Sequence, residues 1–346
     1  MRVLVTGHKG YIGTVMVPML QADGFDVIGL DNDLFDGCVF GDQSICGGIP
    51  DIPYRRKDIR DVEVSDLRGV DAVVHLCALS NDPLGNFNPQ MTYEINHGAS
   101  VKLAKLARKA GVQRYLFSSS CSVYGASGAD MVNEKSKPNP ITPYGLSKIW
   151  AERDISKLAD ASFSPTFLRS ATAYGVSPML RFDVVLNNLV AWAYTTGIVL
   201  LKSDGTALRP IIHIEDISRA FIAVLNTSCD LVHNQIFNVG ITAENWRVRE
   251  LAEIAEDTVP NSNIKYAKDA EPDKRSYRVD FRKIAQTLPK FKPQWNARLG
   301  AKQLYNAYKK VAITLEEFEG PRYRRITHLE NSVNAGRLDK TLRRVS

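Results

Sequence analysis

Tyr144 and Lys148 lie one helical turn apart in the segment ITPYGLSKIWAERDISKLA. Thr142 suits the N-cap of a helix and Pro143 its first position, so this spacing predicts a helix with both side chains on one face. A lysine ammonium beside a phenol stabilises the phenolate and lowers its pKa. Such a tyrosine can take the proton of an alcohol while a hydride leaves the same carbon for a nicotinamide ring.

A run of small hydroxyl side chains precedes this helix in the segment RYLFSSSCSVYG. The apolar start of the run predicts a buried strand over 114–119, which places the serines at its carboxyl end. A serine there can hydrogen-bond the same alcohol oxygen as Tyr144. We expect that partner to be Ser120, in preference to Ser119.

Three glycines, Gly7, Gly10 and Gly13, follow the first strand-like run and open a helix. The first permits a tight turn, the second lets the backbone approach a pyrophosphate, and the third lets helix and strand pack closely. The segment therefore predicts a dinucleotide-binding loop.

The second strand-like run ends at Asp31, about twenty residues after the glycines. A carboxylate there accepts hydrogen bonds from the adenosine ribose and repels a 2′-phosphate, so the sequence predicts NAD rather than NADP. Asp58 has two open readings: it can meet the adenine amine or cap a helix.

Strand-like and helix-like segments alternate through the first half of the chain, and this predicts a doubly wound parallel sheet of the α/β class. A helix is expected over 99–111, and residues 32–57, rich in Gly, Asp and Pro, read as a loop. The expected strands are 2–7, 26–31, 72–78, 114–119 and 164–170.

The alternation weakens after residue 176, and strand-like runs return at 209–216 and 235–240. We expect residues 1–175 to form a dinucleotide-binding domain to which 209–240 returns. Residues 176–208 and 241–346 then supply a smaller lobe with a basic C-terminal tail. That tail could dock on its own lobe or on a second subunit.

Composition narrows the class of protein. The 346 residues are 44% hydrophobic and 24% charged, with a net charge of +6 and a pI near 8.9. The basic residues are dispersed, which favours a small anionic ligand or a solvated surface over nucleic acid. Five cysteines without a CxxC pair indicate a reduced, cytoplasmic chain with no metal site. A strand beginning at residue 2 leaves no room for a signal peptide, and no apolar run has the length of a membrane span.

Together these segments resemble the extended short-chain dehydrogenase/reductase family, in particular its nucleotide-sugar epimerases and dehydratases. The resemblance covers roughly residues 1–290. It rests on VTGHKGYIG, LDND, KDIRD, HLCA, YEINHGA, FSSSCSVYG, PYGLSK, RPIIHIEDISRA and FNVG. It implies a Rossmann-type doubly wound sheet with a smaller C-terminal substrate lobe, NAD as cofactor, a nucleotide-diphospho-sugar as substrate, and a homodimer.

The resemblance also implies which residues form the site. Ser120, Tyr144 and Lys148 would be catalytic, and Arg209 and Arg275 would bind the substrate diphosphate. The further substrate residues would be Cys121, Thr172 and Asn187 or Asn188. The cofactor residues would be Gly7, Gly10, Tyr11, Ile12, Gly13, Asp31, Asn32, Asp58, Ile59, Leu76, Ala78, Asn96, Ser118, Tyr144 and Lys148.

Two departures from the family pattern bear on the reaction. Family members that remove water across C5–C6 carry an Asp–Glu pair after the catalytic hydroxyl, where this chain has Cys121 and Ser122. Neither replaces a carboxylic acid at neutral pH, although Cys121 could serve as a proton donor in an enolising epimerase instead of only filling space. Thr172 stands where the family often has Asn, which alters the sugar pocket.

The sequence thus predicts an NAD-dependent epimerase acting through a transient 4-keto sugar. A nucleotide-sugar oxidoreductase or dehydratase is the enzymatic alternative, and a non-catalytic NAD(H)-sensing protein is the alternative from another class. His75 and His213 are expected to be structural.

Overall fold

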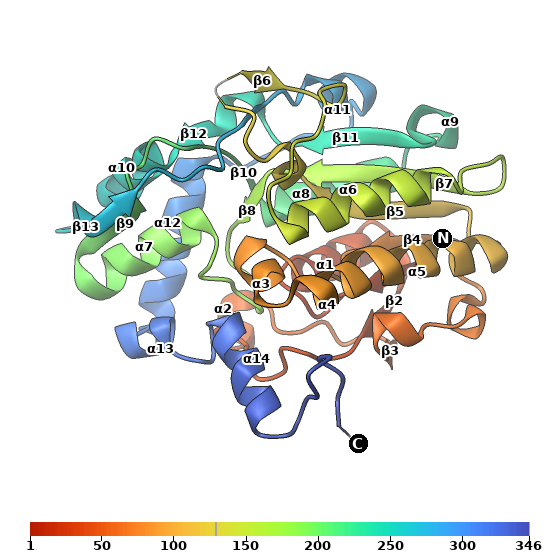
Figure 1. The fold of residues 1–346 in the computed structure, drawn as a ribbon, viewed down its shortest axis with the longest axis horizontal. Helices are drawn as coiled ribbons and strands as arrows, with labels where there is room; N and C mark the ends of the chain where they lie inside the picture. Colours follow the sequence, from red (N-terminus) through yellow and green to blue (C-terminus); the bar gives the residue numbers. More distant parts are fainter. Residues whose placement is uncertain (129, 346) are drawn as a thin grey trace.

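The computed structural model describes residues 1–128 and 130–345. Its centre is a seven-stranded sheet with the order β11-β7-β5-β4-β1-β2-β3, in which all neighbouring strands are parallel (Figure 1). The doubly wound parallel sheet expected from the sequence is confirmed. The strands are β1 (Arg2–Thr6), β2 (Asp26–Asp31), β3 (Tyr54–Arg56), β4 (Ala72–His75), β5 (Arg114–Ser120), β7 (Ser164–Ser170) and β11 (Gln235–Val239).

The sheet is buried on both faces. Within β1, Val3 and Val5 belong to one apolar core and Leu4 belongs to another, because successive side chains of a strand point to opposite faces. The first core includes side chains of α1 (Gly13–Ala22) and α8 (Ile214–Leu225). The second includes side chains of α5 (Ser100–Lys109) and α6 (Pro143–Ser156).

Local boundaries follow the expected capping chemistry. Thr142 caps α6 by accepting a hydrogen bond from the Gly145 amide at 3.2 Å, and Pro143 is the first helical residue, as predicted. Helix α5 ends before Gly111, whose φ of +82° is the left-handed conformation that glycine favours after a helix. A π-helical turn, Glu94–Ala99, precedes α5 without a break.

The sequence predicted a loop over residues 32–57, and this prediction is only partly correct. These residues contain the short helix α2 (Gln43–Cys46) and the edge strand β3. The signal for β3 was absent because it pairs only with β2 and carries two arginines with little burial, whereas the other strands are apolar runs.

The second half of the chain builds a smaller lobe with its own apolar core. The run expected at 209–216 forms β10 (Leu208–His213), which pairs with β8 and β12 in a three-stranded sheet rather than with the large sheet. Helix α8 packs against the large sheet and strand β11 joins its edge beside β7. The other elements of the lobe are β8 (Thr172–Tyr174), β12 (Asn245–Arg247), β9 (Ile198–Ser203), β13 (Asn263–Glu271), α7 (Val185–Thr196), α10 (Val248–Thr258) and α12 (Ala297–Val311).

The basic C-terminal tail docks on its own chain. Helix α13 (Leu315–Glu319) joins the core of the smaller lobe, and α14 (Arg325–Asn334) crosses to pack against α3 (Asp82–Phe87). Figure 1 shows α14 and the chain after it, in dark blue, below the large sheet.

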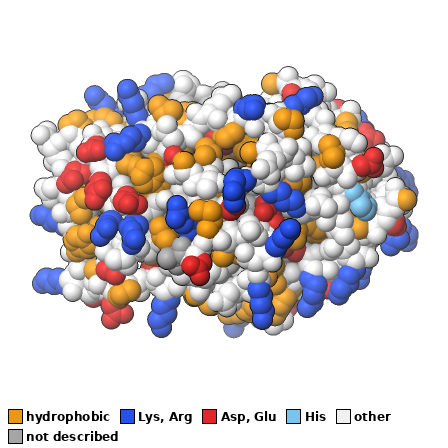
Figure 2. All heavy atoms as spheres, turned by 90° about the horizontal axis from the view of Figure 1, so that it is seen from above, with side chains coloured by type: hydrophobic (Ala, Val, Ile, Leu, Met, Phe, Trp, Pro, Cys, Tyr) orange, Lys and Arg blue, Asp and Glu red, His pale blue; other side chains and the backbone are white. Residues whose placement is uncertain are grey.

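The surface is mixed in character. On the face drawn in Figure 2, Lys and Arg side chains are interspersed with acidic and apolar ones. No helix among the described residues is long and apolar enough to cross a bilayer. All five cysteines are free thiols.

Candidate active site

A cavity of 1380 Å³ opens at the carboxyl ends of the central strands, between the sheet and the smaller lobe. Ligands of open α/β sheets bind at this edge. The expected cofactor residues that line it are Gly7, Gly10, Tyr11, Ile12, Gly13, Asp31, Asn32, Asp58, Ile59, Leu76, Ala78, Ser118, Tyr144 and Lys148.

The glycine loop has the geometry that a pyrophosphate cradle needs. Gly7 has a φ of +74°, and a Cβ on Gly13 would lie 2.3 Å from the Gly7 carbonyl oxygen. A Cβ on Gly10 would lie 3.1 Å from the same oxygen. These positions tolerate no larger residue without backbone movement, so the loop presents bare backbone and the start of α1 to the cavity.

Asp31 ends β2 at the cavity, where the sequence reading placed the adenosine ribose. Its carboxylate accepts hydrogen bonds from the Lys9 amide at 3.1 Å and the Asp33 amide at 3.0 Å. Burial raises its pKa above the ordinary aspartate value. The bare glycine cradle and this oriented carboxylate fit NAD, and the contact of Asp31 with the adenosine ribose stays a prediction.

Asp58 lines the cavity and also acts as a cap. Its carboxylate accepts a hydrogen bond from the Arg60 amide at 2.8 Å and pairs with the Arg60 guanidinium at 2.7 Å. The capping reading is therefore confirmed, and the contact with adenine stays a prediction.

Asn96 stands behind the cavity wall rather than in it. Its side chain accepts a hydrogen bond from the Leu79 amide at 2.8 Å and donates to the Leu79 carbonyl at 2.9 Å. The amide also donates to Ser147 on α6 at 3.2 Å. Asn96 thus fixes the loop after β4 against the helix that carries Tyr144 and Lys148, and it does not line the cavity as the expected cofactor residue would.

The Ser120, Tyr144 and Lys148 side chains converge on the cavity from β5 and α6. The Ser120 hydroxyl faces the Tyr144 phenol and opposes the rise in the Tyr144 pKa that burial causes. Ser119 instead donates to Glu152 at 2.5 Å, within a buried pair of Glu152 and Arg169. This geometry favours Ser120 over Ser119 as the partner of the tyrosine.

The electrostatics of this group differ from the sequence expectation. Burial raises the pKa of Tyr144 to about 12. Burial also lowers the pKa of Lys148 to about 8, and its ammonium donates to the Ser118 carbonyl at 2.7 Å. The ammonium lies 5.8 Å from the Tyr144 ring centre. The cavity desolvates both groups, so the lysine alone does not produce a low phenol pKa.

The two arginines expected at the substrate diphosphate share an acidic partner. Arg209 and Arg275 both donate to Asp273 at 2.7 Å, and Arg275 also reaches Asp82 at 2.7 Å. Asp82 in turn accepts a hydrogen bond from Thr142, the cap of α6, at 2.6 Å. All four charged side chains line the cavity, and they link the smaller lobe to the entrance of the catalytic helix.

The remaining substrate residues divide into two groups. Thr172 and Asn188 line the cavity, and the Asn188 amide donates to the Phe182 carbonyl at 2.8 Å. Asn187 does not line it: its buried side chain donates to Tyr11 and to the Arg181 carbonyl. The assignment of Asn187 to the substrate is therefore wrong, since its helical position turns it toward the lobe interior.

Cys121 also lies outside the cavity. It is fully buried, its thiol donates to the Arg169 carbonyl at 3.1 Å, and burial raises its pKa far above the ordinary thiol value. The expectation that it contacts substrate is wrong, and the space-filling reading holds. Ser122, the next residue, does line the cavity.

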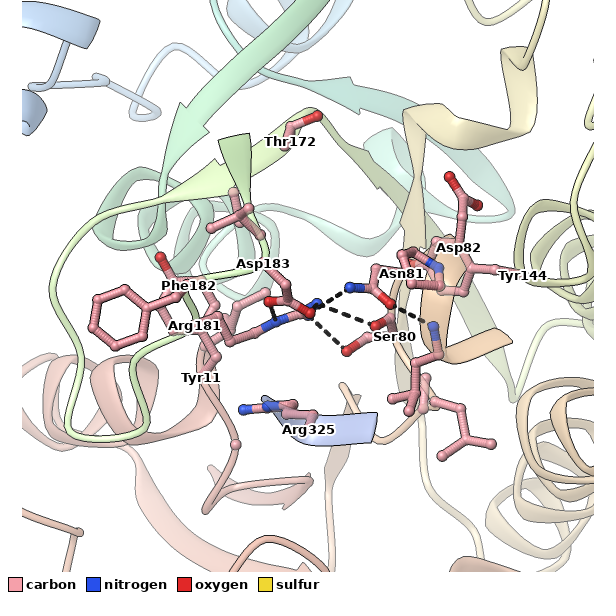
Figure 3. Close-up of a pocket in the computed structure, with 18 of the residues that line it drawn as sticks. Tyr11, Ser80, Asn81, Asp82, Tyr144, Thr172, Arg181, Phe182, Asp183 and Arg325 are labelled. Atoms are coloured by element: carbon pink, nitrogen blue, oxygen red, sulfur yellow. Dashed lines mark hydrogen bonds and ion pairs between the residues drawn. The ribbon is translucent and has the colours of Figure 1, made fainter. Parts of the chain in front are cut away.

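Sequence reasoning missed a polar cluster on the opposite wall of the cavity. Arg181 pairs with Asp183 at 2.8 Å and donates to Ser80, and Asn81 donates to Asp183 (Figure 3). Arg325 of α14 enters the same space. No motif marks these residues, because the fold brings them together from three distant segments.

The two histidines set aside as structural are confirmed in that role. His75 is hydrogen-bonded by Thr6 at 2.6 Å and Ser100 at 2.8 Å inside the sheet core. His213 contacts Gln303 at 2.8 Å and stacks on Trp295. In the described part of the chain, no group of three His, Cys, Asp or Glu side chains is arranged to hold a metal ion.

Comparison with known proteins agrees with this fold and site. Residues 3–240 match the model of the NAD dependent epimerase/dehydratase family, and the chain belongs to that family. It is an NAD-dependent enzyme of the extended short-chain dehydrogenase/reductase type.

Individual relatives are more distant. The chain is 29% identical to a UDP-glucose 4-epimerase of Neisseria meningitidis serogroup C over 69% of this chain and 77% of the relative. It is 27% identical to a putative UDP-glucose 4-epimerase of Methanocaldococcus jannaschii, over 88% of this chain and 97% of the relative. Among solved structures, MoeE5 in complex with UDP-glucuronic acid and NAD superposes with a TM-score of 0.77 at 28% identity, covering 90% of this chain and 99% of that one.

Proposed function

We propose that this protein is a 4-epimerase of a nucleotide-diphospho-sugar that works through a transient 4-keto intermediate. The observation that carries the proposal is the convergence of Ser120, Tyr144 and Lys148 on the cavity that also holds the glycine loop. The relatives named UDP-glucose 4-epimerase support a UDP-hexose as the first substrate to test.

Each side chain has a distinct part in the proposed reaction. Tyr144 takes the proton of the sugar C4 hydroxyl onto its phenolate oxygen, and Ser120 holds that hydroxyl by a hydrogen bond. Lys148 stabilises the phenolate by its charge. NAD, held by the glycine loop and Asp31, would supply a reversible hydride acceptor for C4. The keto sugar then turns in the cavity, and Tyr144 gives its proton back to the carbonyl oxygen, so protons and electrons balance.

The absence of a suitable acid beside Ser120 favours epimerisation over dehydration. Cys121 occupies one of the two positions that dehydratases give to carboxylic acids, and its thiol faces the Arg169 carbonyl, away from the cavity. Ser122 occupies the other, and a hydroxyl is not an acid at neutral pH. Asp82 is a carboxylate in the cavity, but Thr142 and Arg275 occupy its two oxygens.

The test is a proton NMR time course in D₂O with UDP-glucose, UDP-galactose and UDP-glucuronic acid, without added cofactor. We expect a C4 epimer without incorporated deuterium, because the hydride returns internally. Deuterium at C3 or C5 would indicate enolisation, and a 4-keto-6-deoxy product would indicate dehydration. Tyr144→Phe should abolish turnover while the cofactor stays bound, whereas Tyr305→Phe, outside the cavity, should leave it unchanged. Full activity of Tyr144→Phe would refute the assignment.

We further propose that the protein acts as a cytoplasmic homodimer. The five free thiols support a reducing compartment. Helices α5 and α6, which pack side by side on the outer face of the sheet, are the proposed contact surface. Light scattering coupled to size-exclusion chromatography tests this: a mass near 38.5 kDa would exclude the dimer.

A further inference from the structure

The C-terminal segment, residues 320–345, packs against the nucleotide-binding half of the molecule. Leu329, Leu338 and Leu342 are buried in the core that also holds Leu4 of β1 and Leu30 of β2. The segment is therefore an ordered part of that half and not a solvated basic tail.

The segment braces the adenosine end of the cavity. The Arg344 guanidinium donates to the carbonyls of Asn32 at 3.1 Å and Asp33 at 2.7 Å, directly after Asp31. Arg60, which holds Asp58, donates to the Thr341 carbonyl at 2.8 Å. These contacts reach both loops that the sequence assigns to the adenosine, so the segment fixes them relative to each other.

Arg325 is the residue of this segment that faces the cavity. Figure 3 shows it reaching from α14 into the space below Arg181 and Asp183, on the side of Tyr11. Its guanidinium lies 4.3 Å from the centre of the Phe35 ring. Arg181 is paired with Asp183, whereas Arg325 forms no ion pair with any residue that the structure describes.

Two cations lie close together on this cavity wall. Arg181 and Arg325 share the space, and Asp183 pairs with the first of them. Burial lowers the pKa of Arg325 to about 10, and the charge of Arg181 acts in the same direction. Arg325 is thus a partly buried cation beside a like charge, and an anion bound here would offset the unfavourable burial and the repulsion.

We propose that Arg325 is a cofactor-binding residue that pairs with the diphosphate of the dinucleotide, and that the C-terminal segment closes the site over the adenosine end. Tyr11 lies in the glycine loop and Phe35 follows β2, so Arg325 stands where the dinucleotide passes from its pyrophosphate to its adenosine. The diphosphate of a nucleotide sugar is a second source of the same chemistry, but Arg209 and Arg275 already provide cations for it on the smaller lobe. The inference goes beyond the proposed function, since it does not depend on which sugar is converted.

The test compares the full-length protein, freed of cofactor, with Arg325→Gln and with Arg337→Gln, an exposed arginine of the same segment. Binding of NAD⁺, ADP-ribose, adenosine and UDP is measured by calorimetry. Arg325→Gln should bind NAD⁺ and ADP-ribose about 10- to 100-fold more weakly, because a charge-assisted contact to the diphosphate is lost. Adenosine and UDP should bind as before, and Arg337→Gln should match the wild type.

Unchanged NAD⁺ affinity of Arg325→Gln would overturn the proposal. If UDP binding is weakened at the same time, Arg325 belongs to the sugar-nucleotide site instead. The unliganded Arg325→Gln protein should melt at or above the wild-type temperature, because a repelling charge is gone. If that variant does not fold, Arg325→Lys is compared with Arg337→Lys. It keeps the charge and loses the planar donors, so it should bind NAD⁺ several-fold more weakly, and equal affinity would refute the pairing.

The closing role has a kinetic readout of its own. Arg344→Ala removes the two hydrogen bonds to the loop after Asp31 and leaves Arg325 in place. It should speed the release of bound NAD⁺, followed by exchange against a labelled cofactor. A release rate equal to that of the wild type would show that the segment does not close the site.

Discussion

Replacing Lys148 by methionine tests how the site activates Tyr144. The ammonium of Lys148 lies 5.8 Å from the Tyr144 ring centre in a cavity that desolvates both groups. For charges about 6 Å apart and an effective dielectric constant of about 20, losing the ammonium costs a phenolate about 3 kcal/mol and raises the Tyr144 pKa by about 2. Below that pKa, turnover should fall about 100-fold, because the rate follows the phenolate fraction.

The pH dependence of the defect is the sharper signature. Burial places the pKa of Lys148 near 8, so the wild-type lysine is charged at pH 7 and loses its proton as the pH rises. The ratio of wild-type to Lys148→Met rates should therefore be largest near pH 7 and shrink above pH 8.

The assay is single-turnover conversion of a saturating UDP-hexose across this pH range. Lys157→Met is the matched control, because Lys157 lies in the exposed residues directly after the same helix and pairs only with Asp154. A ratio that stays constant with pH would refute the electrostatic reasoning and leave Lys148 a purely positional role.

Three further predictions follow from particular contacts. Gly13→Ala places a Cβ 2.3 Å from the Gly7 carbonyl oxygen, so it should lower the free energy of unfolding by about 1–3 kcal/mol and weaken NAD⁺ binding. Thermal melting with and without NAD⁺ measures both effects, and unchanged melting and binding would contradict the prediction. Glu152→Gln leaves the buried Arg169 without its counter-charge, so urea unfolding should show a loss of about 3–5 kcal/mol, against no more than about 0.5 for the exposed Glu253→Gln. Burial lowers the pKa of His8 to about 4, so between about pH 6.5 and 4 the unfolded chain binds a proton that the folded protein does not. The free energy of unfolding should therefore be highest above pH 7 and fall by about 3 kcal/mol across that window. A urea midpoint that does not change with pH would contradict this.

Much of the fold was predictable because its signals are local. Apolar runs marked six of the seven strands of the large sheet, all but β3, and capping chemistry marked the start of α6 at Thr142. The edge strand β3 escaped because an edge needs little burial, so its arginines carry no strand signal. The pairing of β10 with β8 and β12 was not predicted, because an apolar run indicates a strand but not the sheet to which the strand belongs.

The candidate site divides in the same way. Gly7, Asp31, Ser120 and Tyr144 belong to short motifs whose spacing reflects one turn or one strand end, so the sequence alone determined the cofactor class and singled out Tyr144 for the proposed proton transfer. Only tertiary structure decided that Cys121 faces away from the cavity, because neighbouring residues at a strand end point in opposite directions. Tertiary structure also brought Arg325, from the end of the chain, to the glycine loop at its start. Local periodicity carries no information about contacts separated by 300 residues, which arise when the two halves bury a common core.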